Sequence, residues 1–514
     1  MTDVEGLALW DLIEWRAEQT PDGLLAVRED GTELSFGGYR DRCLETAAAL
    51  HERGVGRDDP VAWMLPTWIE TLVVAGALAR LGAVQVPLIP NLREREIGFI
   101  LTQSGARHLI LPGPWRRFDY PEMAASVMDA LGRHLDLVVV DRVLPAGDPS
   151  VLPPWPAVRP EPGDDPIRWI FYTSGTTANP KGTLHTDGTV AAISSRLNDR
   201  FEMTAEDRNA LVFPITHIGG MTWLMGGLMA GYSHIMIEVF HPLESCAVLR
   251  RLGVTIVGSG PAFWMAIIAE QRRHPEGPAF PCLRALVGGG ASKPPTIDDE
   301  VRDILGVVLA TGYGSSECPG LAHSGVSDSE EVRRSDGYAL DDVEIRIVGP
   351  DGSALAPGQT GEIVVSGPML FKGYLDPADN VGVFDDAGRF RTGDVGTLDP
   401  AGLLRVTGRL KDIIIRNGEN ISAKEVEDVL YRHPGIVDAA AVALPDAERG
   451  ELCCAVVVLG PGVDSLSLAE IDEHCRRLGL ARFKTPERLE IVAQLPRNTT
   501  GKVLKSELQD RFGP

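Results

Sequence analysis

Apolar runs of strand length alternate with runs of helix length over two long segments of the chain, and this alternation constrains the fold most. Within residues 61–111 the order is apolar VAWML, an amphipathic run at 68–81, AVQVPL, a charged run at 93–104, and HLIL. Strands that alternate with helices are typical of parallel sheets, because each helix returns the chain to the edge where the next strand begins. The segment therefore predicts a β-α-β-α-β unit.

A second alternating segment follows a proline-rich stretch at residues 144–166. Its apolar runs, within residues 210–312, read ALVFPI, HIMIEV, VTIVG, LRALV and VVLATG, with helical runs between them. After Ser335 the pattern changes to short strands separated by turn residues: EIRIV, GEIVV and the hairpin-like LDPAGLLRV. We therefore expect an α/β fold with two doubly wound sheets packed together and a small antiparallel β unit.

The chain after Gly408 carries a pattern of its own. Strand-like AAAVALPD, ELCCAVVVLG and RLEIVAQLP alternate there with helical stretches, one near residues 468–478 and one at the end of the chain. This segment has the size of a small α+β domain. The predicted domains are therefore an N-terminal domain of residues 1–408 and a C-terminal domain of residues 409–514.

Length and charge exclude several classes of protein. The 514 residues exceed the size at which one core usually stops growing, so more than one domain is expected. The formal net charge of −23 argues against binding of nucleic acid or of an anionic membrane, because both need a basic surface. The longest apolar stretch, residues 71–89, is interrupted by Arg80 and Gln85, so we assign no membrane span.

The cysteines and the N-terminal residues favour a cytoplasmic protein. The seven cysteines are odd in number and show no CxxC spacing, which favours reduced thiols. Asp3, Glu5 and Asp11 stand where a secretory leader would carry positive charge. We therefore expect a cytoplasmic location, and we leave a homodimer open.

The stretch YTSGTTANPKG, residues 172–182, crowds hydroxyls and glycines around one lysine. Such residues are common in surface turns, but an apolar run precedes this stretch and a helical run follows Thr186. We therefore expect a loop between a buried strand and a helix, where α/β proteins bind ligands. Backbone N–H groups, hydroxyls and a lysine together suit a polyphosphate. The loop is not a Walker A motif, because Pro180 precedes Lys181 and Gly182 follows it.

Five further motifs accompany this loop along the chain. They are GGGAS at 288–292, TGYGSSE at 311–317, RTGD at 391–394, GRLKDIIIRNGENISAKEVE at 408–427 and PRNTTGK at 496–502. With the loop, they resemble the motifs of the adenylate-forming superfamily of acyl- and aryl-CoA synthetases, nonribosomal-peptide adenylation domains and firefly luciferase, in the same order. The resemblance covers essentially the whole chain, and the N-terminal half is also similar to ligases for medium-chain and cyclohexanecarboxylic acids.

The resemblance implies an ATP-dependent carboxylic acid:CoA ligase. Such enzymes use ATP and Mg²⁺ to join a carboxylate to AMP with release of pyrophosphate, and then transfer the acyl group to coenzyme A. Attack on the α-phosphorus brings two anions together, which calls for positioning and charge neutralisation by the protein. The resemblance also implies that the C-terminal domain is mobile and rotates about Lys411 between the two half-reactions.

The resemblance also implies a nucleotide site. The β- and γ-phosphates would be held by Thr173, Ser174, Gly175, Thr176, Thr177 and Lys181. Adenine and the α-phosphate would lie against Gly289, Gly290, Ala291, Gly312, Tyr313, Gly314, Ser315 and Ser316, with Tyr313 stacked on the base. Asp394 would accept hydrogen bonds from the ribose hydroxyls, and Arg409 would contact the ribose or a phosphate. Gly418 would let the thiol of coenzyme A pass close to the backbone.

Three residues are expected at the reacting atoms. Lys502 would stabilise the charge shared between the attacking carboxylate and the α-phosphate. Glu317, with the hydroxyl of Thr177, would coordinate Mg²⁺, which prefers oxygen ligands. His217 would line the acid site. Ser316 stands where the family generally has threonine, which keeps the hydroxyl and loses the methyl group.

The acid would bind beside FPITHIGGMTW, residues 213–223. Relatives that activate amino acids place an aspartate there, whereas this chain has PITH at 214–217, and an unpaired ammonium would be costly to bury. The cleft is expected to be lined by His217, Gly219, Gly220, Met221, Trp223 and Gly289, with the small residues making room. We therefore expect a medium-chain, alicyclic, aromatic or polycyclic acid.

Two alternatives stay open. An acyl-AMP ligase would load a carrier protein in place of coenzyme A, and a non-catalytic relative would only bind the nucleotide. The presence of Lys181, Glu317, Asp394 and Lys502 argues against the second alternative. Asn417 stands where glycine is frequent in the family, and asparagine also tolerates the positive φ that such a turn needs.

Overall fold

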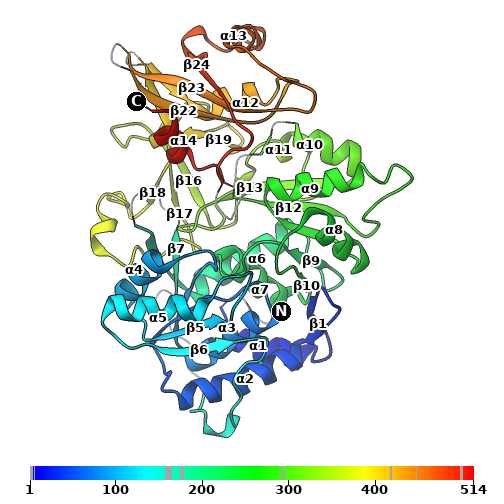
Figure 1. Cartoon of the computed structure of the whole chain (residues 1–514), viewed down its shortest axis with the longest axis vertical. Coiled ribbons are helices and arrows are strands. Elements are labelled where there is room, and N and C mark those ends of the chain that lie inside the picture. The colour runs from blue at the N-terminus through cyan, green and yellow to red at the C-terminus, as the bar shows by residue number, and fades with distance from the viewer. Residues whose placement is uncertain are drawn as a thin grey trace.

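The computed structural model describes residues 4, 6–156, 165–173, 179–290, 293–294, 296–416, 419–446, 449–497 and 502–513. Two wound sheets with their helices form most of the molecule (Figure 1). The chain from residue 410 onward, which we call the C-terminal unit, lies at one end, and the first elements of the chain lie at the opposite end. The predicted α/β class with a smaller C-terminal part is confirmed.

The first sheet contains the β-α-β-α-β unit predicted for residues 61–111. Its strands in spatial order are β6 (Asp136–Val140), β5 (His108–Pro112), β3 (Pro60–Trp63), β4 (Val84–Pro87), β7 (Ile167–Thr173) and β8 (Lys181–Thr186). The connecting helices are α3 (Ile69–Leu81), α4 (Glu94–Ser104) and α5 (Tyr120–Leu131). β3 pairs in parallel with both β4 and β5. All three helices end at a left-handed glycine, Gly82, Gly105 or Gly132, a conformation that glycine adopts at little cost.

The second sheet carries the strands predicted within residues 210–312. Its strands in spatial order are β15 (Tyr338–Ala339), β14 (Ala322–His323), β13 (Val308–Tyr313), β12 (Ala285–Gly289), β11 (Ile256–Ser259), β9 (Arg208–Leu211), β10 (Ser233–Met236), β1 (Leu24–Arg28) and β2 (Glu33–Ser35). Every adjacent pair from β13 to β1 is parallel, whereas the outer strands β15, β14 and β2 pair antiparallel. The N-terminal strands β1 and β2, which the sequence pattern did not reveal, extend this sheet at its far edge.

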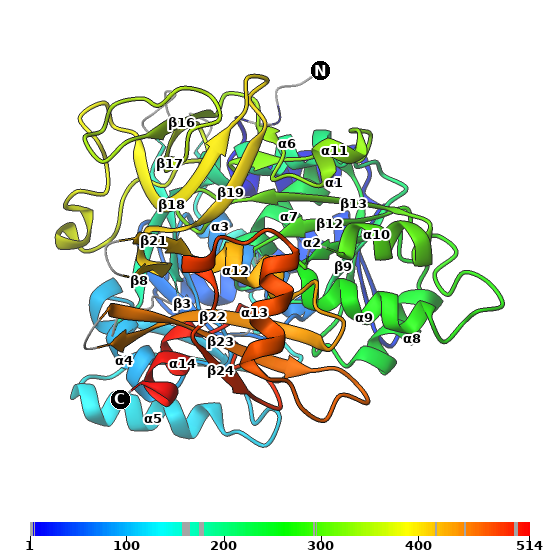
Figure 2. The same ribbon diagram turned by 90° about the horizontal axis from the view of Figure 1, so that it is seen from above.

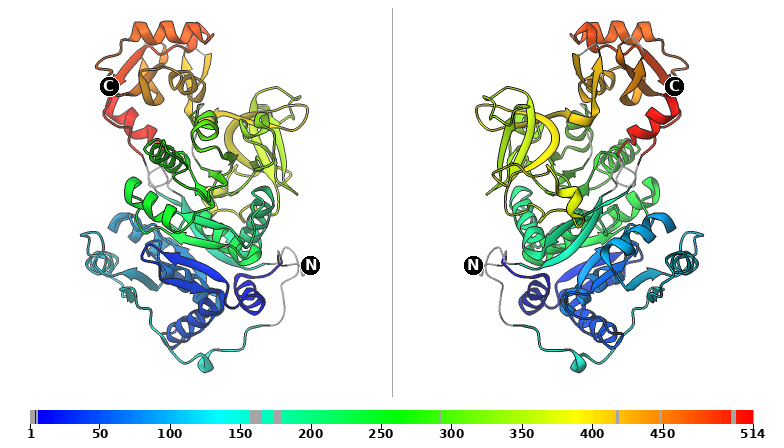
Figure 3. Two further views of the ribbon diagram at one scale, coloured as in Figure 1. Left: turned by 90° about the vertical axis from the view of Figure 1, so that its right-hand side faces the viewer. Right: turned by 90° about the vertical axis from the view of Figure 1, so that its left-hand side faces the viewer.

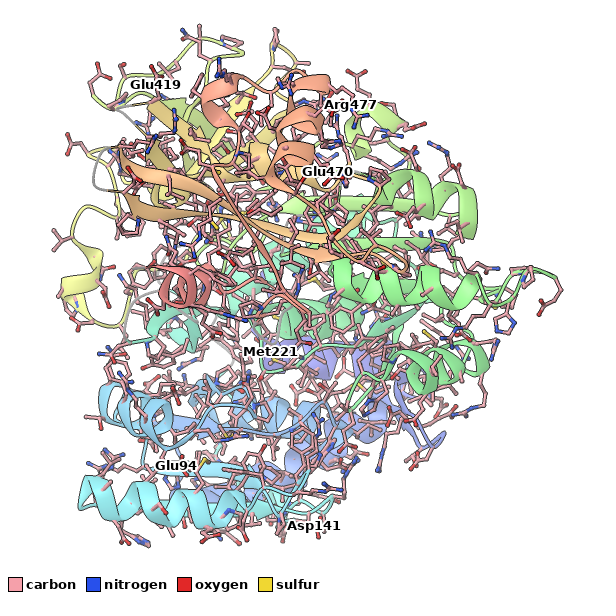
Figure 4. All side chains as sticks on the ribbon, turned by 45° about the horizontal axis from the view of Figure 1, so that its top comes forward. Glu94, Asp141, Met221, Glu419, Glu470 and Arg477 are labelled. Atoms are coloured by element: carbon pink, nitrogen blue, oxygen red, sulfur yellow. The ribbon has the colours of Figure 1, made fainter. Side chains whose placement is uncertain are left out.

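Helices cover both sheets and join their cores. They are α1 (Leu9–Gln19), α2 (Phe36–Glu52), α6 (Asp187–Arg200), α7 (Ile218–Ala230), α8 (Pro242–Arg251), α9 (Pro261–Gln271) and the short α10 (Ile297–Glu300) and α11 (Glu330–Arg333). One hydrophobic cluster includes Trp63 and Trp169 of the first sheet and Ile256 of the second. Figure 4 shows Met221 of α7 in the interior, where it is fully buried.

The polyphosphate loop has a different second flank from the one expected. β7 is the predicted buried strand, but the chain after the loop forms β8, which pairs antiparallel with β7 from Thr173 and Lys181 to Ile167 and Thr186. The predicted helix, α6, begins only at Asp187. The loop therefore joins two strands of a hairpin. The sequence KGTLHT of β8 is polar, and its hydrogen bonds to β7 decide its conformation.

An antiparallel sheet follows, as the sequence predicted beyond Ser335. It contains β16 (Glu344–Val348), β17 (Gly361–Ser366), β18 (Phe390–Leu398) and β19 (Leu404–Arg409) in this order. The hairpin expected from LDPAGLLRV is the connection between β18 and β19. Figure 3 shows this sheet beside the C-terminal unit, at the end of the molecule away from the first elements of the chain.

The C-terminal unit begins with a short 3₁₀ turn, Leu410–Asp412, directly after β19. Its elements are β20 (Ile413–Arg416), β21 (Glu419–Ser422), α12 (Ala423–Leu430), β22 (Ile436–Asp446), β23 (Gly450–Leu459), α13 (Leu468–Arg477), β24 (Arg488–Ile491) and α14 (Lys505–Phe512). The strands form one sheet, in which β23 lies between β22 and β24. Seen from above, this sheet and its helices lie over the large wound part (Figure 2).

The cysteines agree with the expectation of reduced thiols. All seven lie within the described residues and have free thiols, and six of them are buried. Among the described residues, no helix is long and apolar enough to cross a membrane.

Candidate active site

Lys181 lies at the start of β8, opposite Thr173 at the end of β7. Its Nζ is 2.8 Å from Oδ1 of Asp379 and 5.0 Å from the centre of the Tyr374 ring. The predicted phosphate residues Ser174, Gly175, Thr176 and Thr177 lie outside the described residues. Of the predicted polyphosphate cradle, the structure therefore describes the two end residues, Thr173 and Lys181. The Lys181 ammonium lies over the face of the Tyr374 ring.

Glu317 is joined to this lysine through Tyr374. The Tyr374 hydroxyl donates to Oε1 of Glu317 at 2.8 Å, and the backbone N–H of Phe371 donates to the Glu317 carbonyl at 2.8 Å. Burial, with the neighbouring Glu317 carboxylate, raises the pKa of Tyr374, so the phenol stays neutral and donates its proton. The predicted metal residue and the predicted phosphate lysine therefore contact the same aromatic side chain.

Asp394 lies between the predicted adenine residue and the end of β19. The Tyr313 hydroxyl donates to Oδ2 of Asp394, and Nε of Arg409 lies 2.8 Å from Oδ1. Asp394 is buried and pairs with Arg409 across the β18–β19 hairpin. Residues predicted separately from three motifs therefore meet at the Asp394 carboxylate.

Lys502 faces this carboxylate from the C-terminal unit. Burial, reinforced by the positive charges of Arg409 and Lys411, lowers the pKa of Lys502 to about 8, while Asp394 opposes that shift. Burial and Arg409 also lower the pKa of Lys411. Three cations therefore crowd around Asp394 in a protein with a strongly negative net charge. Such a cluster is costly by itself, and an anionic ligand would stabilise it.

The glycines predicted for adenine binding occur where backbones approach closely. A Cβ on Gly289 would lie 2.4 Å from the Gly312 carbonyl oxygen, and one on Gly314 would lie 2.5 Å from the Pro319 carbonyl oxygen. Gly290 has a φ of +86°, in the left-handed region. These glycines let the ends of β12 and β13 lie side by side, and Ala291 lies outside the described residues.

Ser315 and Ser316 follow β13 in a turn that His185 fixes. The Ser315 N–H donates to the Cys318 carbonyl at 2.9 Å, and Nε2 of His185 lies 2.8 Å from the Ser316 carbonyl. Burial lowers the pKa of His185 to about 4, so its ring is neutral and can donate to that carbonyl. Sequence analysis did not identify His185, Tyr374 or Asp379, because each is distant in sequence from the residue it supports.

A cavity of about 250 Å³ adjoins these residues. Its wall combines apolar side chains with a few polar ones: Pro87, Ile89, Leu92, Glu96, Ile100, Phe171, Tyr172, Thr173, Pro180, Thr216, His217, Ile218 and Ser316. His217 precedes α7 as its N-cap residue, and burial lowers the pKa of its imidazole, which is therefore neutral at pH 7. The structure thus brings His217, Thr173 and Ser316 to one cavity.

Of the other predicted acid-site residues, four lie in α7 and Gly289 is the last residue of β12. Trp223 is buried, with its Cζ2 atom 2.1 Å from where a Cβ on Gly258 would be. A Cβ on Gly220 would lie 2.2 Å from the Ile215 carbonyl oxygen, whereas Gly219 has its nearest contact, Phe213, at 3.6 Å. The Ile215 backbone therefore leaves no room for a side chain at position 220. This packing explains the glycine there without any contact with the acid.

The residues that surround Glu317 fit one Mg²⁺ ion carried by a nucleotide. The described residues contain no group of three or more histidine, cysteine or acidic side chains that could hold a metal ion by themselves. Mg²⁺ is commonly held by one or two carboxylates together with substrate phosphates. Glu317 offers a carboxylate near Lys181, whereas Thr177 and the thiol-route residue Gly418 lie outside the described residues.

Comparison with known proteins agrees with this geometry. Residues 13–375 match the model described as AMP-binding enzyme, and residues 425–502 match the AMP-binding enzyme C-terminal domain. The medium-chain fatty-acid–CoA ligase of Escherichia coli (strain K12) is 30% identical over 97% of this chain and 89% of its own. Feruloyl-CoA synthase of Amycolatopsis sp is 33% identical over 99% of each. The crystal structure of ATP-bound MatB from Rhodopseudomonas palustris has a TM-score of 0.87 at 27% identity, over 98% of this chain and 99% of that one.

Proposed function

The chain belongs to the AMP-binding enzyme family and is an ATP-dependent acid:CoA ligase, and from this premise we propose how its residues divide the reaction. One observation supports the assignment most: the cations of Arg409, Lys411 and Lys502 gather around the Asp394 carboxylate, which the Tyr313 hydroxyl also contacts. This arrangement suits a nucleotide whose phosphates meet local positive charge.

In the first half-reaction an oxygen of the acid attacks the α-phosphorus of ATP. A new P–O bond forms, the bond to the β-phosphate breaks, and pyrophosphate leaves. Lys502 stabilises the charge between the carboxylate and the α-phosphate, and Lys181 holds the leaving phosphates. Bound Mg²⁺ would neutralise phosphate charge, with Glu317 as its protein ligand. Asp394 accepts hydrogen bonds from the ribose hydroxyls in place of those from Tyr313 and Arg409.

The acid occupies the cavity beside His217. Apolar side chains form most of its wall, residues 214–217 supply no acidic group, and the carboxylate of the lining residue Glu96 already accepts the backbone N–H of Arg93 at 3.2 Å. Because His217 is neutral, it can donate a hydrogen bond to the acid without adding charge. We propose a medium-chain, alicyclic, aromatic or polycyclic acid without an amino group next to the carboxylate.

In the second half-reaction the thiol of coenzyme A attacks the acyl carbon, and AMP leaves. A second cavity, of about 470 Å³, shares Ile89 with the first, so the two are adjacent. Arg93 and Arg116 line it, together with Trp115, Phe118 and other aromatic side chains. Arginines and aromatic rings suit a phosphorylated nucleotide, so we propose that the acceptor reaches the acid cavity from this side.

The C-terminal domain, residues 409–514, rotates between the half-reactions in this proposal. In the present arrangement Lys502 faces Asp394 and Arg409, which suits formation of the adenylate. Lys411 lies in the 3₁₀ turn that connects the two parts of the chain. Rotation there would withdraw Lys502 and bring the Gly418 loop to the site for thiol transfer.

Release of pyrophosphate across a panel of carboxylic acids, with and without coenzyme A, tests this function. We expect acid-dependent release in both cases and a thioester only when coenzyme A is present. Release without any thioester would favour the alternative in which a carrier protein accepts the acyl group. Absence of release with every acid would favour the non-catalytic alternative.

A further inference from the structure

Ion pairs hold described residues on both sides of Lys502. Nη2 of Arg497 lies 2.7 Å from Oδ2 of Asp438 in β22. Nζ of Lys505, the first residue of α14, lies 2.7 Å from Oε1 of Glu427 in α12. Lys502 therefore lies between two residues that are fixed to different elements of the C-terminal unit.

Lys505 occupies a position where a lone cation is unfavourable. The first turn of a helix carries partial positive charge, and the Lys505 side chain is only 22% exposed. The Glu427 side chain is 12% exposed, and its Oε1 also accepts the backbone N–H of Ala441 at 2.9 Å. A half-buried cation beside a fixed, buried carboxylate forms a defined contact, unlike a pair of mobile surface charges.

Lys505 also faces the turn that joins the two parts of the chain. Its Nζ lies 4.0 Å from Oδ2 of Asp412, the last residue of the 3₁₀ turn Leu410–Asp412. Arg409, the partner of Asp394, directly precedes that turn. Lys505 therefore links the segment that carries Lys502 to the segment that carries Arg409.

We infer that Lys505 is a positioning residue for adenylate formation. It holds the start of α14 between α12 and the 3₁₀ turn, and thereby sets where the amine of Lys502 lies relative to Asp394 and Arg409. The inference rests on the proposed role of Lys502. Because Lys502 is proposed to act only in the first half-reaction, Lys505 matters for that half-reaction alone.

The half-reactions separate this role from general stability. With the acid that gives the fastest exchange in the wild type, Lys505→Met lowers acid-dependent ATP–pyrophosphate exchange by about 10-fold or more, because small displacements of a catalytic group cost that much. Thioester formation from supplied acyl-adenylate and coenzyme A stays within about 2-fold of wild type. Lys505→Arg restores most of the exchange.

Arg488 of β24 contacts the other end of α14, so a substitution of Arg488 provides a matched control. Its Nη1 donates to the Phe512 carbonyl at 2.9 Å, and its Nε lies 2.7 Å from Oε1 of Glu490. Arg488→Met should leave both half-reactions unchanged. Equal losses in the two half-reactions of Lys505→Met, or the same loss of exchange in Arg488→Met, would overturn the inference.

A second variant and a second readout cover a failure of Lys505→Met to fold. Asp412→Asn keeps the ion pair between Lys505 and Glu427 and should lower exchange by about 3-fold. Unchanged exchange would count against the inference.

Competitive acetylation followed by mass spectrometry measures the pKa of the Lys502 amine without any acid substrate. We expect that pKa to rise in Lys505→Met, as the released turn exposes the amine, and an unchanged value would contradict the inference. This readout remains valid even if wild-type protein shows no exchange, the result that would refute the proposed function.

Discussion

Arg409 and Asp394 form an ion pair across the β18–β19 hairpin, with Nε 2.8 Å from Oδ1, and the Tyr313 hydroxyl donates to the second oxygen of the same carboxylate. The carboxylate is thus held by one residue of the nucleotide site and by the residue that precedes the connecting turn. Ribose hydroxyls would have to replace these partners. This exchange makes Asp394 a sensitive reporter of nucleotide binding.

Asp394→Ala should raise the KM for ATP by about 10- to 100-fold, because hydrogen bonds to a charged group contribute about 1.5–3 kcal/mol. The KM for the acid should change little, because the side chains seen to hold the Asp394 carboxylate, Tyr313 and Arg409, are not among those that line the acid cavity. Steady-state kinetics with each substrate varied in turn checks this expectation. A parallel rise in both KM values would show that the variant damages the site as a whole.

The kcat/KM of adenylate formation should fall as the pH rises through about 8, the pKa of Lys502 in the protein without nucleotide, because kcat/KM follows the ionisation of the free enzyme. The charged amine is the active form, so deprotonation removes the stabilisation of the α-phosphate. The pH profile of ATP–pyrophosphate exchange checks this, and thioester formation from supplied acyl-adenylate should lack the same limb. Lys502→Gln should lose about 100-fold or more in exchange and lose the limb as well. A limb that persists in this variant would belong to another group.

The buried charge of Lys502 should also lower the free energy of unfolding. Its pKa is lower in the folded protein than in the unfolded chain, so the unfolded chain binds more protons between pH 8 and the ordinary lysine value, and the free energy of unfolding rises with pH across that window. Below pH 8 the buried charge lowers the free energy of unfolding by its full amount. Lys502→Met should therefore raise Tm at pH 7, measured by calorimetry without nucleotide. A lower Tm would mean that the crowding by Arg409 and Lys411 is already compensated.

Tyr374→Phe separates two roles of one ring. The phenyl ring keeps the contact with Lys181 and loses the hydrogen bond that orients the Glu317 carboxylate. The Mg²⁺ concentration for half-maximal activity should rise about 5-fold, as expected for the loss of about 1 kcal/mol. A titration of exchange with Mg²⁺ at saturating ATP provides the measurement. An unchanged Mg²⁺ dependence would argue against Glu317 as the metal ligand.

Gly220→Ala tests whether this glycine serves packing or substrate binding. The added methyl group would lie 2.2 Å from the backbone oxygen of Ile215, a contact that neither residue can avoid by rotating a side chain. We expect a loss of about 1–3 kcal/mol in the free energy of unfolding, measured with denaturant. Unchanged stability together with a changed preference among acids would instead place Gly220 at the acid.

The wound sheets could be predicted from sequence because each strand is an apolar run bounded by helical runs. α3 was found in this way, but it was predicted as amphipathic, whereas all of its residues are buried, Glu70 and Arg80 included. β8 could not be found in this way, because its polar sequence carries no alternation and its partner, β7, fixes it by backbone hydrogen bonds. Strands β1 and β2 also escaped: β1 is held in the sheet by β10, a segment far away in the chain, and β2 pairs with β1.

The site shows the same division. Lys181, Glu317, Asp394 and Lys502 were predicted because motifs of the family contain them. The residues that contact and orient them were not predicted. Tyr374, for example, lies in no quoted motif, yet it contacts both Lys181 and Glu317. Such residues are chosen by three-dimensional proximity, and a single sequence does not encode that proximity in any local pattern.

The transfer of oxygen from the acid to AMP tests the central claim most directly. When an acid labelled with oxygen-18 in its carboxylate reacts with ATP and coenzyme A, attack on the α-phosphorus places one acid oxygen in the mixed anhydride. That oxygen leaves with AMP when the thioester forms. The account predicts AMP that carries one oxygen-18 atom, read by mass spectrometry. Unlabelled AMP, or oxygen-18 in the released phosphate, would contradict it.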